Sequence, residues 1–289
     1  QKIRGLRASE SFSEKDLFDC EYWSLEQAKL GKGAAPKFQG KVVMITGGSG
    51  TIGFAIAKAF SKLGAQTIIV DKDEPSLKKA VNSLGTGHEY LTLDVTSPEA
   101  AEQAMLGSIQ KFGGLDILIS NAGAAHAGSM LSISEDDLRG AFELNFFSHY
   151  SFATAAAKVF QNQNRGGQIL FNISKQAVNP GKNFGAYGLP KATTFFLMKQ
   201  LALELGSKGI RVNGVNADRI RSGLLTDDFI SSRAKSRSVS EADYMAGNLL
   251  NKEVTAEHVA DAFTSLACAE STTGHVMTVD GGNIEASLR

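Results

Sequence analysis

Residues 42–60 read VVMITGGSGTIGFAIAKAF, and this stretch decides the fold class of the chain. An apolar run rich in β-branched residues leads into glycines at positions 47, 48, 50 and 53, and then into an apolar pattern of helical period. A strand, a glycine-rich turn and a helix in this order are typical of a dinucleotide-binding βαβ unit, because glycine lets the backbone approach a pyrophosphate at the helix N-terminus. The glycine cluster alone is a weak signal, since a purely structural turn uses the same residues.

The pattern of residues 42–60 recurs along the chain. From Lys41 onward, short apolar runs alternate with segments of helical period, and seven runs qualify as strands, the last of them in HVMTVDGG at 275–282. Such alternation favours crossover units and a parallel sheet. We therefore predict an α/β fold of the Rossmann type, a doubly wound, seven-stranded parallel sheet with helices on both faces. Residues 222–252 have no strand pattern and little periodicity, and we interpret them as a flexible substrate lid over the carboxyl edge of the sheet.

Two regions differ in composition. Residues 1–36 are polar and predict an N-terminal arm or linker, whereas residues 37–289 predict one dinucleotide-binding domain. An aromatic segment at 17–30 is expected to pack on the outside of that domain or on a neighbouring subunit, because clustered aromatic side chains seldom stay solvated; its three aromatic residues are Phe18, Tyr22 and Trp23. The first residue is glutamine rather than methionine, which fits a fragment of a longer protein.

Composition narrows the range of partners. The chain has 30 basic and 30 acidic residues without a long block of one sign, so we expect a small-molecule substrate rather than nucleic acid or a membrane surface. No apolar stretch approaches the roughly 20 residues that span a bilayer. The two cysteines, Cys20 and Cys268, have neither metal-ligand nor disulfide spacing, so we expect no metal site and a cytoplasmic protein.

The ends of the next strands carry residues suited to a dinucleotide. Asp71 lies 18 residues beyond Gly53, where a carboxylate can accept hydrogen bonds from both adenosine ribose hydroxyls and repel a 2′-phosphate. This predicts NAD, with NADP less favoured, although Lys72 opposes the preference. The alternative is that Asp71 only forms a turn. Two further strand ends support the first interpretation, namely LDVT at 93–96, which contains Asp94, and SNAG at 120–123.

A second cluster suggests catalysis. In FNISKQAVNPGKNFGAYGLPK, residues 171–191, Tyr187 and Lys191 are four residues apart and would share one face of a helix. Ser174 precedes Tyr187 by 13 residues at the end of a strand, and Asn145 lies on the preceding helix. Three of the four have a plain structural alternative: a loop cap for the serine, a backbone contact for the asparagine, and a solvated face for the lysine.

Taken together, TGGSGTIG, SNAG, the serine, YGLPK and TGHVMTVDGG resemble the short-chain dehydrogenase/reductase family from about Lys41 to Gly282. The resemblance implies that Tyr187 is the general acid/base, that Ser174 binds the substrate oxygen, and that Asn145 positions a water that relays the proton. Lys191 would hold the nicotinamide ribose and, with the oxidised nicotinamide, lower the pKa of Tyr187 toward roughly 7. The implied cofactor-binding residues are Gly47, Ser49, Gly50, Thr51, Ile52, Gly53, Asp71, Asp94, Val95, Asn121, Ala122, Gly123, Tyr187, Lys191, Ile220 and Ser222.

The aromatic arm, the serine segment and RVNGVNAD at 211–218 are also similar to the dehydrogenase portion of bifunctional rhamnulose-1-phosphate aldolase/short-chain dehydrogenase fusions. This resemblance implies an NAD-dependent oxidoreductase of sugar breakdown that acts on lactaldehyde or on a polyol or sugar-derived alcohol, with an aldolase domain preceding it. The family also implies a homodimer or homotetramer. The alternative is a non-catalytic nucleotide-binding domain, with a regulatory or structural role in a larger aldolase fusion.

Three positions depart from the family pattern. Thr51 replaces a glycine of the turn, Ala217 and Asp218 stand where a Pro-Gly pair is usual, and Pro190 precedes Lys191, which is tolerable in the first turn of a helix. Near the lid, basic residues either contact an anionic substrate or form a solvated loop; they are Arg219, Arg221, Arg233, Lys235 and Arg237.

Overall fold

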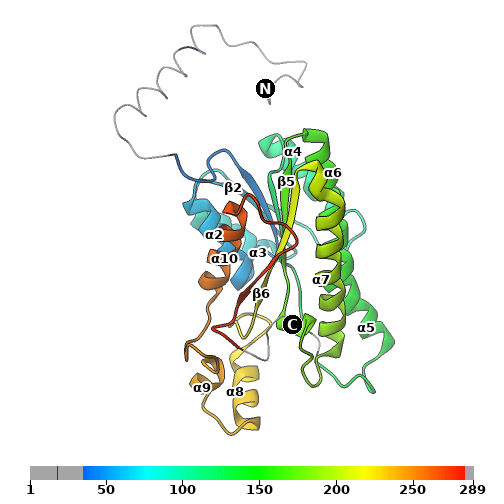
Figure 1. The fold of residues 1–289 in the computed structure, drawn as a ribbon, viewed down its shortest axis with the longest axis vertical. Helices are drawn as coiled ribbons and strands as arrows, with labels where there is room; N and C mark the ends of the chain where they lie inside the picture. The colour runs from blue at the N-terminus through cyan, green and yellow to red at the C-terminus, as the bar shows by residue number, and fades with distance from the viewer. Residues whose placement is uncertain (1–17, 19–34, 126, 284–289) are drawn as a thin grey trace.

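The computed structural model describes residue 18 and residues 35–125 and 127–283 of the chain (Figure 1). The expected packing of the aromatic arm lies outside the described residues, apart from Phe18, whose side chain is exposed.

The centre of the molecule is a seven-stranded sheet in the order β3-β2-β1-β4-β5-β6-β7, and every neighbouring pair is parallel. This confirms the predicted doubly wound Rossmann sheet, with the change of direction between β1 and β4, where ligands of such sheets bind. The strands are β1 (Val42–Thr46), β2 (Gln66–Asp71), β3 (His88–Thr92), β4 (Ile117–Ser120), β5 (Gly167–Asn172), β6 (Ile210–Ala217) and β7 (Val276–Val279).

Helices cover both faces of the sheet (Figure 1). One face carries α2 (Thr51–Lys62), α3 (Glu74–Leu84) and α10 (Ala256–Cys268). The other carries α4 (Ala100–Phe112), α6 (Ser148–Gln163) and α7 (Gly185–Leu205). Within the described residues, no helix is long and apolar enough to cross a membrane.

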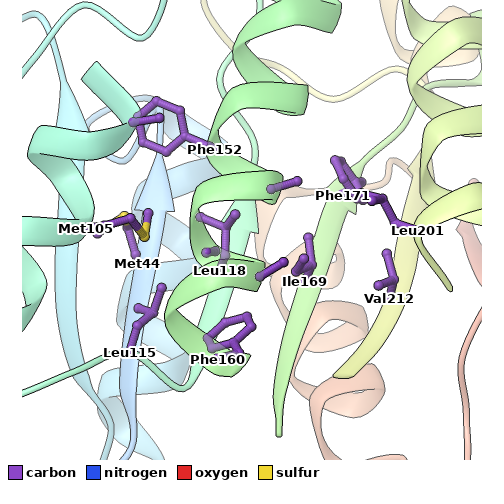
Figure 2. Close-up of a cluster of buried hydrophobic side chains, with 14 of the residues drawn as sticks. Met44, Met105, Leu115, Leu118, Phe152, Phe160, Ile169, Phe171, Leu201 and Val212 are labelled. Atoms are coloured by element: carbon purple, nitrogen blue, oxygen red, sulfur yellow. The ribbon is translucent and has the colours of Figure 1, made fainter. Parts of the chain in front are cut away.

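Each face of the sheet has its own apolar core. Figure 2 shows the core beneath α4, α6 and α7, where Phe152 and Phe160 of α6 lie near Leu118 of β4. The opposite core joins Ile45 of β1 to Phe263 of α10. All five residues of β1 are buried, as expected of a parallel strand that is covered on both faces. A strand that is buried on both faces appears in the sequence as a continuous apolar run rather than an alternating one, and such runs predicted the strands here.

The segment interpreted as a flexible lid differs from expectation, because it contains two helices. They are α8 (Asp227–Ser236) and α9 (Glu241–Met245), capped at their N-termini by the side chains of Thr226 and Ser240. The two helices pack on each other through a small core of their own, formed by Leu225, Ile230, Ala234, Tyr244 and Met245. The lid is thus a folded element that follows β6.

The position of Pro190 also corrects an expectation. The helix α7 begins at Gly185, so Pro190 lies in its second turn rather than its first. Proline has no N–H, and the helix therefore loses one i→i−4 hydrogen bond just before Lys191.

Candidate active site

A cavity of about 960 Å³ lies at the carboxyl edge of the sheet. Every residue predicted to bind the cofactor lines it except Ser49, and so do Ser174, Tyr187 and Lys191. The lid contributes Leu225, Phe229 and Arg233 to the opposite side. Residues from the first strand to the lid, nearly 200 positions apart in the sequence, therefore share one space because parallel strands end at the same edge.

The glycine-rich turn is packed too closely for larger residues at three positions. A Cβ on Gly48 would lie 2.5 Å from the Ile69 Cβ. Gly47 has φ +63, and a Cβ there would lie 2.9 Å from the Ala122 Cα. A Cβ on Gly53 would collide with the carbonyl oxygen of Gly47. Gly50 is less crowded, since its Cβ would meet that oxygen at 3.4 Å, and it serves as the N-cap of α2. The turn closes with Thr51 as the first residue of the helix, so the departure from the family pattern is accommodated without a fourth crowded position.

Asp71 is held at the end of β2 by the glycine-rich turn. Its Oδ2 accepts hydrogen bonds from the Ser49 hydroxyl at 2.7 Å and the Ser49 N–H at 3.3 Å, and its Oδ1 accepts from the Lys72 N–H at 2.8 Å. These contacts explain why Ser49 does not line the cavity but fixes a residue that does. Asp94 is held by Thr96, whose N–H and hydroxyl lower the pKa of that carboxyl.

The end of β4 is tied to its neighbours on both sides. The Asn121 side chain donates to the Thr46 carbonyl of β1 at 3.0 Å and accepts from the Asn172 side chain of β5 at 2.8 Å. The Thr46 hydroxyl accepts from the backbone N–H groups of Asn121 and Ala122. The small residues that follow therefore form a fixed floor of the cavity.

Tyr187 and Ser174 face each other in the cavity. Tyr187 is in the first turn of α7, and Ser174 caps the short 3₁₀ helix η3 (Lys175–Ala177) at the end of β5. Burial raises the pKa of Tyr187 to about 12, and a hydrogen bond with Ser174 acts in the opposite direction. The predicted pKa near 7 counted the charges of Lys191 and of the oxidised nicotinamide, and it left out desolvation of the phenolate. The residues of the protein alone therefore hold Tyr187 as a neutral phenol.

Lys191 is buried one helical turn after Tyr187. Its Nζ donates to the Asn172 carbonyl at 3.0 Å and lies 5.8 Å from the centre of the Tyr187 ring. Burial lowers the pKa of Lys191 to about 7. An ammonium with that pKa changes its charge near neutral pH, which is suited to proton transfer.

Asn145 lies behind the cavity wall, in a π-helical segment, η2 (Glu143–Phe147), between α5 (Glu135–Phe142) and α6. Its amide donates to the carbonyls of Ala124 at 2.9 Å and Ala141 at 3.1 Å, while its buried Oδ1 has no hydrogen-bond partner. A Cβ on Gly123 would lie 2.8 Å from this oxygen and 3.5 Å from the Lys191 Nζ. The absence of a side chain at Gly123 thus leaves Asn145 and Lys191 close to each other.

His149 was not predicted from the sequence as a residue of this site. This buried residue of α6 places its Nε2 3.4 Å from the Lys191 Nζ, and its Nδ1 2.6 Å from the Ser120 hydroxyl at the end of β4. Burial and the neighbouring Lys191 hold the pKa of His149 well below its usual range, so the ring is neutral. Its spacing of four residues from Asn145 was the available signal, because residues four apart share a helix face.

The loop after β6 takes its course from Asp218. This residue accepts hydrogen bonds from Lys175 at 3.3 Å and from the Asn283 side chain at 2.7 Å, and it also pairs with Arg219. Ile220 and Ser222, which follow in this loop, both line the cavity as predicted.

This fold and cavity define an oxidoreductase of the dinucleotide-binding type. A family model described as enoyl-(acyl carrier protein) reductase matches residues 47–283. The chain is 31% identical over 253 residues to secoisolariciresinol dehydrogenase of Forsythia intermedia, covering 86% of this chain and 90% of that protein. The chain belongs to the short-chain dehydrogenase/reductase family, and it is an oxidoreductase.

Other similar proteins differ in length and in described substrate. The uncharacterized oxidoreductase YuxG of Bacillus subtilis is 32% identical over 287 residues, which cover 94% of this chain and 42% of that relative. A solved structure of 3-ketoacyl-(acyl-carrier-protein) reductase from Brucella melitensis, complexed with NADH, superposes with a TM-score of 0.76 at 25% identity, covering 85% of this chain and 99% of that one.

Proposed function

We propose that the protein interconverts a small secondary alcohol or hydroxyaldehyde and its oxidised form, with NAD as cofactor. The observation that carries this proposal is that Ser174, Tyr187 and Lys191 share one cavity with the glycine-rich turn. NAD, when bound, supplies the nicotinamide ring that accepts the hydride of the alcohol. The chain's own residues bind, orient and exchange the proton.

The cavity suits a dinucleotide on structural grounds. The crowded turn leaves the backbone around Gly47 and Gly53 uncovered by side chains, at the N-terminus of α2, where N–H groups favour phosphate. Asn121, Ala122 and Gly123 continue this surface toward the catalytic group. We propose that these residues hold the cofactor, together with the loop residues Ile220 and Ser222 and the strand-end residues Asp94 and Val95.

The preference for NAD over NADP rests on Asp71. Its carboxylate is fixed by Ser49, so it cannot turn away from a 2′-phosphate without losing two hydrogen bonds. Lys72 also lines the cavity and is the one neighbouring charge that opposes this preference.

The proposed chemistry assigns one role to each residue. Ser174 donates a hydrogen bond to the substrate oxygen, and Tyr187 exchanges the proton with that oxygen. Lys191 stabilises the phenolate by its charge, because an ammonium favours the anionic form of a neighbouring acid. The free Oδ1 of Asn145, beside Lys191, is the acceptor for a water that passes the proton toward solvent.

We also propose a substrate, a preceding domain and a cellular location for the protein. The resemblance to aldolase fusions suggests a substrate from sugar breakdown, such as lactaldehyde or a polyol, and a preceding aldolase domain in the full-length protein. More than half of the length of YuxG lies outside the matched region, as a longer fusion protein would show, and this is the support that YuxG gives. A cytoplasmic location fits Cys268, which is unpaired and half-buried.

We further propose that the chain forms a homodimer or homotetramer through α6 and α7. The helix α7 buries Met198 and Leu201 in the core but leaves Phe196 68% and Leu203 79% exposed. On α6, Tyr150 is also exposed. Exposed large apolar residues on adjacent helices are typical of a subunit interface. Sedimentation of the Phe196→Asp variant should show a smaller particle than the wild type, and an unchanged mass would refute the assignment to α7.

The test of the catalytic proposal is the Tyr187→Phe variant, assayed by NADH absorbance on a panel of small diols, hydroxyaldehydes, sugar alcohols, hydroxy acids and sugar phosphates. Proton transfer typically contributes about 10²–10⁴-fold, so turnover should fall to less than a hundredth while NADH binding stays close to the wild-type value. Tyr90→Phe, the same change on the edge strand β3 and outside the cavity, is the matched control and should keep full activity.

Two outcomes would contradict the proposal. Retention of more than about a tenth of wild-type turnover by Tyr187→Phe would place the base elsewhere. NADH binding by a wild type that turns over no member of the panel would favour the alternative, a non-catalytic nucleotide-binding domain.

A further inference from the structure

The basic residues near the lid, which the sequence could not assign to a ligand or to solvent, have different surroundings in the structure. Arg221 is exposed and bonded to Asp227 and Glu253, both at 2.7 Å. Arg219 pairs with Asp218 and donates to the Tyr244 carbonyl. Both side chains therefore have structural partners.

Arg233 on α8 is different. It lines the cavity, and no carboxylate of the described residues forms an ion pair with it. Its Nε is buried without a hydrogen-bond partner. A buried guanidinium N–H that lacks an acceptor carries an unrecovered desolvation cost, which an anionic ligand would remove.

Two aromatic rings fix the orientation of this guanidinium. Its central carbon lies 5.3 Å from the ring centre of Phe184 and 5.5 Å from that of Phe229, and the two rings meet edge to face at 5.8 Å. Stacking on aromatic faces stabilises the cation and leaves the edge of its plane, where the N–H groups are, for a carboxylate or phosphate. The side chain is therefore held in place before any ligand binds.

The same rings connect Arg233 to the catalytic group. Phe184 is the N-cap of α7, and the Tyr187 N–H donates to its carbonyl at 3.1 Å. The surrounding wall is cationic as well: the cavity lining near the lid holds Asp218 against five basic residues, which are Lys175, Lys182, Arg219, Arg233 and Arg237. Asp218 is bonded to Lys175 and pairs with Arg219, and no ion pair among the described residues involves Lys182, Arg233 or Arg237.

We propose that Arg233 is the binding residue for an anionic group of the substrate, so that the preferred alcohol carries a carboxylate or phosphate beside its carbinol carbon. This inference rests on the proposed function, since it places the substrate in the same cavity. It narrows the substrate class from small alcohols in general to hydroxy acids and hydroxyalkyl phosphates.

The experiment measures binding separately from turnover. Isothermal titration calorimetry of protein saturated with oxidised NAD, which cannot reduce a ketone, compares acetoacetate with methyl acetoacetate, and dihydroxyacetone phosphate with dihydroxyacetone. Each pair has the same ketone with and without the negative charge, and the two pairs distinguish a carboxylate from a phosphate. At least one anion should bind at least about tenfold more tightly than its neutral partner, as expected of hydrogen bonds to a charged group.

Arg233→Met should reduce that ratio by about tenfold or more, and Arg233→Lys should fall between the two, because it keeps the charge and loses the planar fork. Lys235→Met is the matched control, since it removes a positive charge from the exposed side of the same helix and should leave the ratio unchanged. Thermal unfolding of each variant shows whether the lid remains folded.

The inference is overturned if both anions bind no more tightly than their neutral partners, or if Arg233→Met keeps the wild-type ratio. Failure of the proposed function has a different signature. If charge-dependent binding through Arg233 is found but the wild type reduces neither ketone with NADH, the anion site stands and the catalytic proposal falls for these substrates.

Discussion

Replacing Lys191 by methionine should shift the pH dependence of alcohol oxidation without removing Tyr187, the proposed proton carrier. The Lys191 Nζ lies 5.8 Å from the centre of the Tyr187 ring. At a separation of about 6 Å and an effective dielectric constant of about 20, a unit charge contributes roughly 3 kcal/mol, which corresponds to about two pKa units. The ammonium favours the phenolate, so its loss raises the pKa of Tyr187.

The sign of the shift follows from the two titrating groups. Burial raises the pKa of Tyr187 to about 12 and lowers that of Lys191 to about 7. The positive charge that Lys191 carries while it is protonated is the charge that favours the phenolate. Alcohol oxidation requires the deprotonated base, and the rate therefore rises with pH. In Lys191→Met the midpoint of this rise should move to higher pH by about two units, and kcat at pH 7 should fall roughly a hundredfold.

The assay is kcat against pH at saturating NAD, since loss of the proposed ribose contact would otherwise raise KM and obscure the shift. Lys175→Met is the matched control, because Lys175 is a lysine of the same cavity that pairs with Asp218 rather than facing Tyr187. Its midpoint should stay within about half a unit of the wild type. A Lys191→Met profile with an unchanged midpoint would refute the electrostatic argument.

Stability provides an independent check that Lys191→Met is folded. The pKa of Lys191 is lowered from 10.5 to about 7 in the folded protein, so its charge opposes folding. This penalty is complete below about pH 7 and disappears as pH rises toward the unfolded value near 10.5. Methionine carries no such penalty, and Lys191→Met should therefore unfold at or above the wild-type temperature at pH 7. A lower melting temperature would contradict this reading of the buried charge.

Three further predictions follow from single contacts. His149→Phe removes the neutral imidazole beside the Lys191 Nζ, so the ammonium loses a polar neighbour and the rate profile should move to higher pH by about one unit. An unmoved midpoint would exclude a positioning role. Asp71→Asn keeps the oxygen that accepts a hydrogen bond from Ser49 but removes the negative charge. The ratio of kcat/KM with NADP to kcat/KM with NAD should rise by about tenfold or more, which corresponds to about 1.4 kcal/mol. An unchanged ratio would show that Asp71 does not determine the choice of cofactor. Gly53→Ala should lower the free energy of unfolding, measured with denaturant, by about 1–3 kcal/mol because its Cβ meets the Gly47 carbonyl. Gly50→Ala should lower it by less than about 1 kcal/mol. Equal losses of stability in the two variants would contradict the packing argument.

The sheet and the cavity were predictable because their signals are local. A buried parallel strand is a continuous apolar run, and each run here ends in glycine, aspartate or asparagine at the sheet edge, as in SNAG after β4. The spacing of Tyr187 and Lys191 likewise needs only the helical period. Parallel strands bring all these ends to one edge of the sheet, so most residues that follow a strand in the sequence also line the cavity.

The features that escaped prediction depend on several elements at once. The lid helices have weak apolar periodicity, although Ser240 followed by Asp243 is a capping pattern that indicates a helix start. The π-helical turn at Asn145 has no sequence signal of its own. The raised pKa of Tyr187 depends on how much protein surrounds the ring, which spacing along one helix cannot reveal.

The burial of Lys191 is better explained by chemistry than by packing. Its Nζ has a backbone carbonyl and a neutral imidazole as partners but no carboxylate within the described part of the chain, so the charge is solvated by dipoles alone. A buried cation without a counterion destabilises a fold, and an apolar side chain of similar length would fill the same space at lower cost. Three elements nevertheless converge on it: β5 through Asn172, α6 through His149, and the glycine at 123 that leaves room beside Asn145. That convergence places an easily deprotonated ammonium next to Tyr187, and this is the condition that proton exchange at neutral pH requires.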